Sequence, residues 1–171
     1  MAWKIPLFKT YADQADEEAV VKVIRRGTFW ACGPEVEAFE KQIAEYIGSK
    51  YALAFNSGTS ALHAMLLAHD IKDCEVIVPS FTFIATANAV LLAGATPVFA
   101  ESESETFGLD VESVKEKITD KTKAIMLIHY GGFPARDTNA IKQLAQEKGL
   151  LFFEDAAESL GASLDGKKVG S

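Results

Sequence analysis

Hydrophobic positions along this chain follow two alternating spacings. Some recur every three or four residues, as Val36, Phe39 and Ile43 do, which is typical of an α-helix with one buried face. Others form short continuous runs, such as residues 150–153, which are typical of strands in the interior of a parallel sheet. We therefore predict helices over residues 13–26, 34–47, 57–69, 83–92, 111–118 and 137–148, and strands over residues 51–55, 75–78, 96–100, 123–128 and 151–155.

The regular alternation of helices and strands predicts an α/β fold, with a mostly parallel sheet and helices on both faces. A chain of 171 residues is long enough for one domain with a sizeable core. Pro34 favours a helix start, Ser57 is a good N-cap, and Gly94 favours a helix end. Residues 165–168 are expected to form a hairpin tip, and the strand order stays open.

Composition and charge narrow the class of protein. Hydrophobic residues make up 49% and charged residues 24%, which is ordinary for a globular domain. The net charge of −7 argues against nonspecific nucleic-acid binding. The N-terminus lacks the apolar core of a signal peptide, and the longest apolar stretch, residues 85–95, is too short to span a bilayer. We expect a cytoplasmic protein without metal, nucleic-acid or membrane partners.

Two segments at predicted strand ends carry the clearest candidate chemistry. Asp155 is the last residue of an apolar strand, and ligands bind at the carboxyl ends of strands in open α/β sheets. Ser57, Gly58 and Thr59 lie between a strand and a helix, where unpaired N–H groups and the helix dipole favour an anion. The same three residues also suit an ordinary helix cap, and from this motif alone the cap is the favoured interpretation.

Further candidates surround these two segments. An aromatic residue after the strand that ends at Pro79 can stack on a flat ring, although packing in the core at the start of a helix is the favoured role. Glu158 lies three residues beyond Asp155, close enough to face the same pocket. Trp30, in a loop bounded by glycines, is equally suited to line a sugar pocket or to cover the edge of the core. For His129, after another strand, a structural role is favoured over general acid–base catalysis.

An ordered series of motifs resembles the DegT/DnrJ/EryC1/StrS family of pyridoxal-phosphate (PLP) sugar aminotransferases, over essentially the whole chain. The matching segments are residues 5–7, 33–40, 56–62, 79–83, 106–109, 129–134 and 153–162. The resemblance implies the large domain of a type I PLP-dependent fold and PLP as the cofactor. It also implies a nucleotide-linked keto-sugar substrate, glutamate or glutamine as amino donor, and a homodimer with its active site at the subunit interface.

The resemblance also implies roles for individual residues. Ser57, Gly58 and Thr59 would bind the cofactor phosphate, and Phe83 would lie against the pyridine ring. Asp155 would be the catalytic carboxylate that keeps the ring nitrogen protonated, so that the ring withdraws electrons during transamination. Glu158 would also face the cofactor, although family members usually carry Gln or His there to bind the phenolic oxygen of the ring.

In this family the Schiff-base lysine and the small C-terminal domain follow a short way beyond Ser171. Lys167 and Lys168 precede that position, in the predicted hairpin tip. We therefore expect residues 1–171 to be an incomplete large domain that is inactive alone. A PLP-dependent sugar dehydratase, in which histidine replaces the lysine, is the alternative within the family. The alternatives from other classes are a non-catalytic binding or oligomerisation module and an unrelated nucleotide-binding α/β domain.

Overall fold

The structure is a computed structural model that describes residue 5 and residues 9–171 of the chain. Pro6 and Leu7, from the first of the family-like motifs, lie outside the described residues. The chain divides into two units, Met1–Phe39 and Glu40–Ser171, hereafter unit 1 and unit 2.

Unit 1 contains helix α1 (Gln14–Arg26) and the beginning of helix α2 (Pro34–Ile47), as predicted. Asp13 caps α1 by accepting the N–H of Asp16, whose side chain accepts the N–H of Asp13 in return. The guanidinium of Arg26, the last residue of α1, donates to both carboxylate oxygens of Glu35 in the first turn of α2, at 2.7 and 2.8 Å. This ion pair ties the end of one helix to the start of the next.

Within the described residues, unit 2 contains a four-stranded parallel sheet of order β2-β1-β3-β4. Its strands are β1 (Glu75–Pro79), β2 (Thr96–Ala100), β3 (Thr122–Ile128) and β4 (Leu151–Asp155). Its helices are α3 (Gly58–Ala68), α4 (Ala85–Leu92), α5 (Val111–Lys117), α6 (Thr138–Lys148) and the 3₁₀ turn η1 (Tyr130–Gly132). These bounds agree with the predicted elements to within one or two residues, except for residues 51–55.

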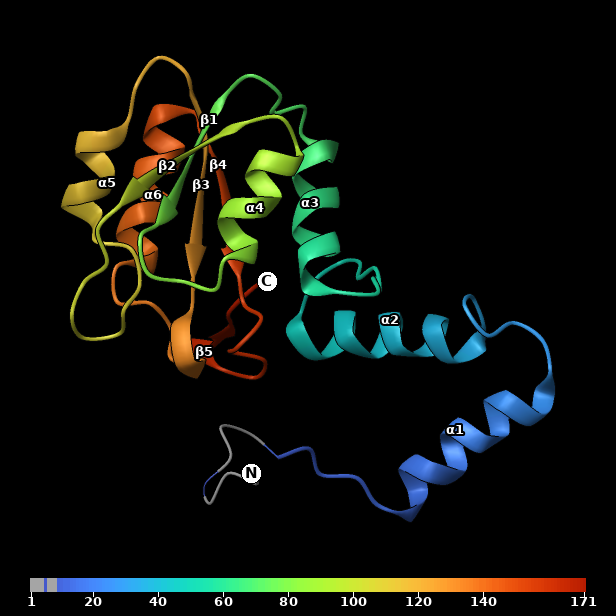
Figure 1. Ribbon diagram of the computed structural model, residues 1–171. Coiled ribbons are helices and arrows are strands. Elements are labelled where there is room, and N and C mark those ends of the chain that lie inside the picture. The colour runs from blue at the N-terminus through green and yellow to red at the C-terminus, as the bar shows by residue number, and fades with distance from the viewer. Residues whose placement is uncertain (1–4, 6–8) are drawn as a thin grey trace. The chain divides into compact units, whose positions relative to one another are not determined.

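Alternate residues of each strand point to opposite faces of the sheet, and each face has its own core. Val76 and Val78 of β1 pack on the side of α3 and α4, whereas Ile77 between them packs on the side of α5 and α6. Figure 1 shows α3 and α4 on one side of the sheet and α5 and α6 on the other. The prediction of a mostly parallel sheet covered on both faces is therefore confirmed.

The predicted strand over residues 51–55 is wrong. This segment forms no ladder with any strand in the part of the chain that the structure describes. Tyr51 and Leu53 are exposed, and the Ala54 N–H donates to the Glu40 carboxylate at 2.8 Å. An apolar alternating segment becomes a strand only when another strand accepts and donates its backbone hydrogen bonds, and none does so here.

The predicted hairpin tip is confirmed by β5 (Ser163–Leu164) and β6 (Lys167–Lys168), which pair antiparallel. The two turn residues, Asp165 and Gly166, both have positive φ values of 50° and 77°. That combination is typical of a type I′ turn, in which Asp-Gly is a preferred pair.

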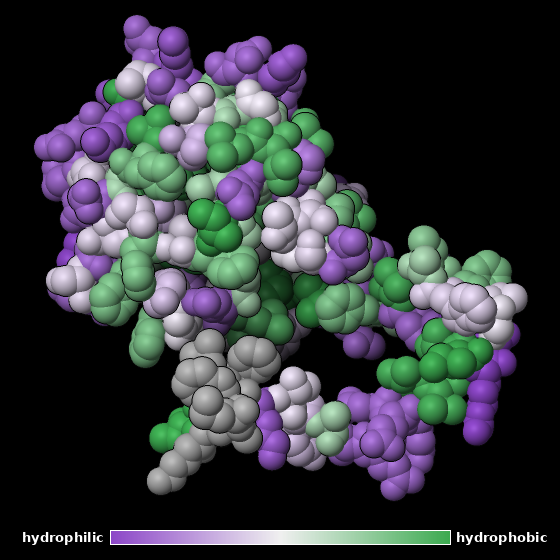
Figure 2. All heavy atoms as spheres, in the orientation of Figure 1, coloured by the Kyte–Doolittle hydropathy of each residue, from purple (hydrophilic) through white to green (hydrophobic). Residues whose placement is uncertain are grey.

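Large hydrophobic side chains also reach the surface of unit 2. Leu91 and Leu92 at the end of α4 and Phe99 on β2 are more than half exposed. Figure 2 shows hydrophobic atoms at the surface of this unit among hydrophilic ones. Within the described residues, no helix combines the length and the apolar character needed to cross a membrane.

Candidate functional site

A cavity of about 250 Å³ lies where the carboxyl ends of β3 and β4 meet the N-termini of α3 and α4. This is the edge at which open α/β sheets bind ligands. Five of the residues predicted as site residues line the cavity, together with four that were not predicted. The nine are Gly58, Thr59, Leu62, Phe83, Ala85, Ile128, Asp155, Ala157 and Glu158.

Asp155 is the buried acidic residue of this cavity and is only 6% exposed. Its Oδ2 accepts a hydrogen bond from the Thr86 hydroxyl at 2.9 Å, and its Oδ1 accepts the Ala157 N–H at 3.2 Å. Its backbone is held by the residue that follows β3, because the His129 N–H donates to the Asp155 carbonyl at 3.1 Å. A buried carboxylate needs such donors, and it remains available to bind a cationic N–H in the cavity.

The start of α3 gives the cavity a positive partial charge, opposite to the negative charge of a carboxylate. The Ser57 side chain accepts the Ser60 N–H at 3.1 Å, so the expected helix cap is present. A Cβ added at Gly58 would meet no protein atom within 4 Å, so the backbone here borders open space. The first N–H groups of a helix have no intrahelical partners, and those of Gly58 and Thr59 lie at the cavity, where they can bind an anion.

Two nearby phenylalanines have different environments. Phe81 packs in an aromatic cluster, with its ring centroid 5.7 Å from that of Phe107 and 4.8 Å from that of Tyr130. Phe83 lines the cavity instead and is 70% exposed. Phe83 therefore presents the ring that is available to stack on a flat ligand.

Glu158 lines the cavity, but its carboxylate is tied to the neighbouring turn. Its Oε2 accepts the N–H of Gly131 in η1 at 2.7 Å. Gly131 adopts a φ of 63° inside that turn, which is a conformation that glycine adopts without strain. One oxygen of Glu158 is thereby directed to the loop after β3.

His129 is fully buried and does not line the cavity. Its Nδ1 accepts the Ala135 N–H at 3.0 Å, which assigns the ring proton to Nε2. Nε2 then donates to the Glu154 carboxylate at 3.0 Å, and the other oxygen of Glu154 accepts the Gly170 N–H at 3.2 Å. These contacts favour the structural role expected for His129.

Lys167 and Lys168, which precede the expected Schiff-base position, are not among the residues that line the cavity. Lys168 donates to the Gly161 carbonyl at 2.7 Å, and its ammonium lies 5.0 Å from the centroid of the Tyr46 ring. These contacts hold the β5–β6 hairpin against α2. Lys167 is exposed on the same hairpin.

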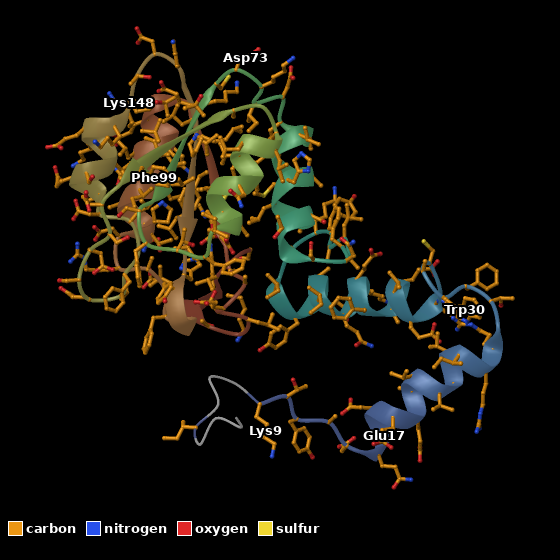
Figure 3. All side chains as sticks on the ribbon, in the orientation of Figure 1. Lys9, Glu17, Trp30, Asp73, Phe99 and Lys148 are labelled. Atoms are coloured by element: carbon orange, nitrogen blue, oxygen red, sulfur yellow. The ribbon has the colours of Figure 1, made fainter. Side chains whose placement is uncertain are left out.

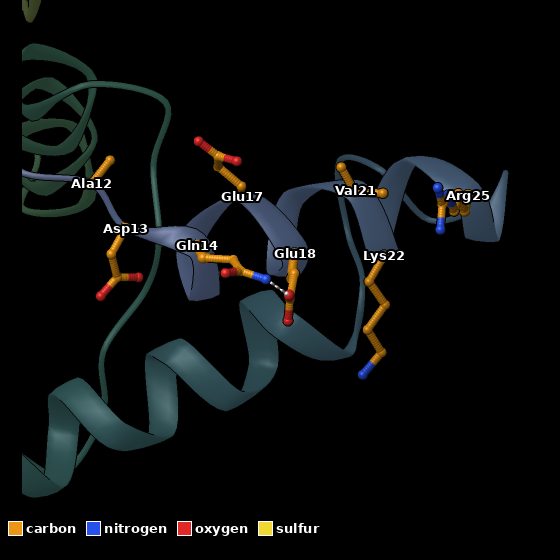
Figure 4. A pocket seen from close by; sticks show the side chains of 8 residues that line it. All are labelled: Ala12, Asp13, Gln14, Glu17, Glu18, Val21, Lys22 and Arg25. Carbon is orange, nitrogen blue, oxygen red and sulfur yellow. Dashed lines mark hydrogen bonds between the residues drawn. The ribbon is translucent and has the colours of Figure 1, made fainter.

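Trp30 belongs to unit 1, where it extends from the loop between α1 and α2 (Figure 3). Trp30 belongs to a different unit from the cavity, and its role in substrate binding stays a prediction. Unit 1 also has a hollow of about 850 Å³ along α1 (Figure 4), lined by Ala12, Asp13, Gln14, Glu17, Glu18, Val21, Lys22 and Arg25. Its lining comes only from α1 and the two residues before it. The hollow is therefore the surface along one side of a single helix and not an enclosed pocket.

Sequence reasoning missed Thr86, the residue of α4 that donates a hydrogen bond to Asp155. The available signal was the pair Thr82 and Thr86, two hydroxyls four residues apart at the start of a helix that follows a strand. Small and aliphatic lining residues such as Ala85 and Ile128 carry no such signal. Among the described residues, no group of three or more His, Cys, Asp or Glu side chains is placed to hold a metal ion.

Several known proteins are similar to this chain. GDP-perosamine synthase of Vibrio cholerae is 39% identical over 168 residues, which are 98% of this chain and 46% of that protein. The aminotransferase of Psychrobacter cryohalolentis has a solved structure with a TM-score of 0.89 and 39% identity, over 94% of this chain and 41% of that one.

The E. coli GDP-4-keto-6-deoxy-D-mannose-3-dehydratase with bound hydrated PLP also has a TM-score of 0.89, with 29% identity over 97% of this chain and 44% of that one. The chain thus spans less than half the length of these relatives. The sequence profile of the DegT/DnrJ/EryC1/StrS aminotransferase family matches residues 10–171. By this match, the chain belongs to the DegT/DnrJ/EryC1/StrS aminotransferase family.

Proposed function

We propose that the protein is a PLP-dependent aminotransferase acting on a nucleotide-linked keto-sugar, with glutamate or glutamine as the amino donor. Proteins of this family are PLP-dependent. The observation that carries the proposal is the placement of the buried Asp155 carboxylate and the N-terminus of α3 in one cavity. A phosphorylated pyridine needs these two features, an anion site at one end and a carboxylate for its ring nitrogen at the other.

The residues present fit this cofactor. The N–H groups of Gly58 and Thr59 would bind the phosphate, with Ser57 holding the helix end in shape. Phe83 would cover one face of the ring, and Asp155 would hold a proton at the ring nitrogen. When bound, PLP supplies an electron-withdrawing ring that stabilises negative charge on the substrate carbon.

Glu158 has a more limited role in this proposal. Its Oε2 already accepts the Gly131 N–H, so that oxygen acts on the loop after β3. We assign Glu158 to the wall of the cofactor site, where it holds η1 against the cavity. Relatives that carry Gln or His here can donate a hydrogen bond to a phenolic oxygen, whereas an ionised glutamate cannot.

The names of the relatives point to a GDP-linked sugar substrate. The test is incubation of the native-length protein and PLP with GDP-4-keto-6-deoxymannose and glutamate. We expect the keto oxygen to be replaced by an amino group, with one equivalent of 2-oxoglutarate released for each amino sugar. Binding of PLP without any turnover, across GDP- and TDP-linked keto-sugars, would refute the aminotransferase proposal.

The alternative is a PLP-dependent dehydratase, which the similarity to the E. coli 3-dehydratase favours. The same assay separates the two activities. A dehydratase would remove the C3 hydroxyl of the sugar, and no amino sugar would accumulate.

We further propose that residues 1–171 form the incomplete large domain of a longer protein whose Schiff-base lysine follows Ser171. Trp30 would contribute to the sugar site of a cytoplasmic homodimer. The exposed side chains of Leu91, Leu92 and Phe99 would be covered by the rest of that longer protein or by its second subunit. The intact mass of the native polypeptide tests this proposal. A mass above twice 18.5 kDa supports it, whereas a mass of 18.5 kDa would favour a non-catalytic module.

A further inference from the structure

The hydroxyl of Thr86 is a buried polar group whose partner is not local. Thr86 lies in the first turn of α4, is 0% exposed, and has its Oγ1 2.9 Å from Oδ2 of Asp155, which is 69 residues away in the sequence. A threonine hydroxyl in a helix often bonds to a carbonyl of the preceding turn. Here it bonds to Asp155, the buried one of the two carboxylates that line the cavity.

The direction of this hydrogen bond follows from the chemistry of the two groups. An ionised carboxylate only accepts, so the Thr86 hydroxyl must be the donor. Thr82 Oγ1 lies 3.0 Å from Thr86 Oγ1, on the other side of the same hydroxyl. Because the Thr86 proton is directed to Asp155, the Thr82 hydroxyl must donate to Thr86, which gives a chain of two donors that ends on Asp155.

These two linked hydrogen bonds hold the Asp155 carboxylate from a second structural element, the start of α4. Oδ1 of Asp155 accepts the Ala157 N–H from its own loop, and Oδ2 accepts the hydroxyl from α4. Two donors on different oxygens fix the rotation of the carboxylate plane. A hydroxyl whose own oxygen accepts a hydrogen bond is also a stronger donor, so Thr82 reinforces the effect of Thr86.

We propose that Thr86, oriented by Thr82, is a positioning residue that aims the Asp155 carboxylate and stabilises its charge. The inference rests on the proposed function, in which Asp155 faces the ring nitrogen of PLP. A proton shared between a carboxylate and a pyridine nitrogen stays on the nitrogen when other donors stabilise the carboxylate. Thr86 and Thr82 thus help to keep the ring nitrogen protonated.

The test is the ¹⁵N chemical shift of the ring nitrogen, in native-length protein reconstituted with PLP labelled at that atom. Thr86→Val keeps the shape of the side chain and removes the hydroxyl, whereas Thr86→Ser keeps the hydroxyl. We expect the signal to move toward that of a neutral pyridine in Thr86→Val, and to stay at the wild-type position in Thr86→Ser. Retention of PLP should weaken roughly three- to tenfold in Thr86→Val only.

Thr138→Val is a matched control. Thr138 is a buried threonine in the first turn of α6, and its hydroxyl donates to the Ala135 carbonyl at 2.6 Å rather than to the site. A purely structural role for Thr86 predicts that Thr86→Val and Thr138→Val both lower stability and both leave the nitrogen signal unchanged. An unchanged signal in folded, PLP-bound Thr86→Val would overturn the proposal.

Two further variants keep the test decisive. Thr82→Val leaves every contact of Asp155 in place, and it serves as the test if Thr86→Val does not fold. A smaller shift of the nitrogen signal in the same direction supports the proposal. An unchanged signal in Thr82→Val overturns it. Asp155→Asn tests the proposed function itself. If Asp155→Asn also leaves the signal unchanged, Asp155 does not face the ring nitrogen, whereas a change in Asp155→Asn alone refutes only the role of Thr86.

Discussion

Replacement of His129 by leucine tests the structural role that its contacts assign to it. The imidazole is 0% exposed and joins three segments, because Ala135 donates to it, it donates to Glu154, and Glu154 accepts the Gly170 N–H. Leucine has a similar volume and fills the space, but it offers neither an acceptor nor a donor. The variant thus isolates the two hydrogen bonds from the packing of the side chain.

The expected loss follows from those two bonds. A buried backbone N–H left without a partner, here that of Ala135, costs about 1–3 kcal/mol. Loss of a hydrogen bond to a charged group costs about 1.5–3 kcal/mol, although Glu154 retains the Gly170 N–H and is partly exposed. Some of this is offset by burial of an apolar side chain, so we expect the free energy of unfolding to fall by about 2–5 kcal/mol.

Urea unfolding followed by far-ultraviolet circular dichroism measures this change. For a protein of this size the loss corresponds to a fall in Tm of roughly 4–20 °C. His63→Leu is the control, since His63 lies on α3 and is only partly buried, and its free energy of unfolding should change by under about 1 kcal/mol. A change under 1 kcal/mol in His129→Leu together with loss of turnover would refute the structural role and favour acid–base catalysis.

Three further predictions concern the site and its surroundings. Asp155→Ala should nearly abolish turnover in the native-length protein while its circular dichroism spectrum stays unchanged, and near-normal activity would contradict the assignment to the ring nitrogen. The Arg136 guanidinium, 2.8 Å from Asp137, lowers the pKa of that carboxyl below its ordinary value of 3.8, so this contribution to stability is present above pH 3.8 and is lost as the pH falls below it. Arg136→Met should therefore flatten the acid side of the stability–pH curve in urea titrations, with no flattening if the pair contributes nothing. Residues 1–171 alone should form no borohydride-reducible PLP adduct at a specific lysine, because Lys168 is engaged with Gly161 and Lys167 is outside the cavity, and stoichiometric labelling of either lysine by mass spectrometry would contradict this.

Local sequence was sufficient for most helices and strands, because their signals act over a few residues. Helix α1 lies within the range predicted for it, Pro34 opens α2 as predicted, and the Asp165–Gly166 turn closes the predicted hairpin. These outcomes depend on backbone preferences and on side chains that bond to their own neighbourhood. The segment over residues 51–55 has an equally clear local pattern, yet it forms no strand among the described residues, since pairing requires a partner from elsewhere in the chain.

The sequence by itself supplied the candidate site residues and placed Asp155 at the carboxyl end of a strand. Only the tertiary structure decided that Gly58, Phe83 and Asp155 line one cavity, because they come from elements that are distant in the sequence. It also decided that Thr86 donates to Asp155 and that Glu158 binds the turn at Gly131. Such contacts depend on the order and packing of the strands, which no local pattern of residues encodes.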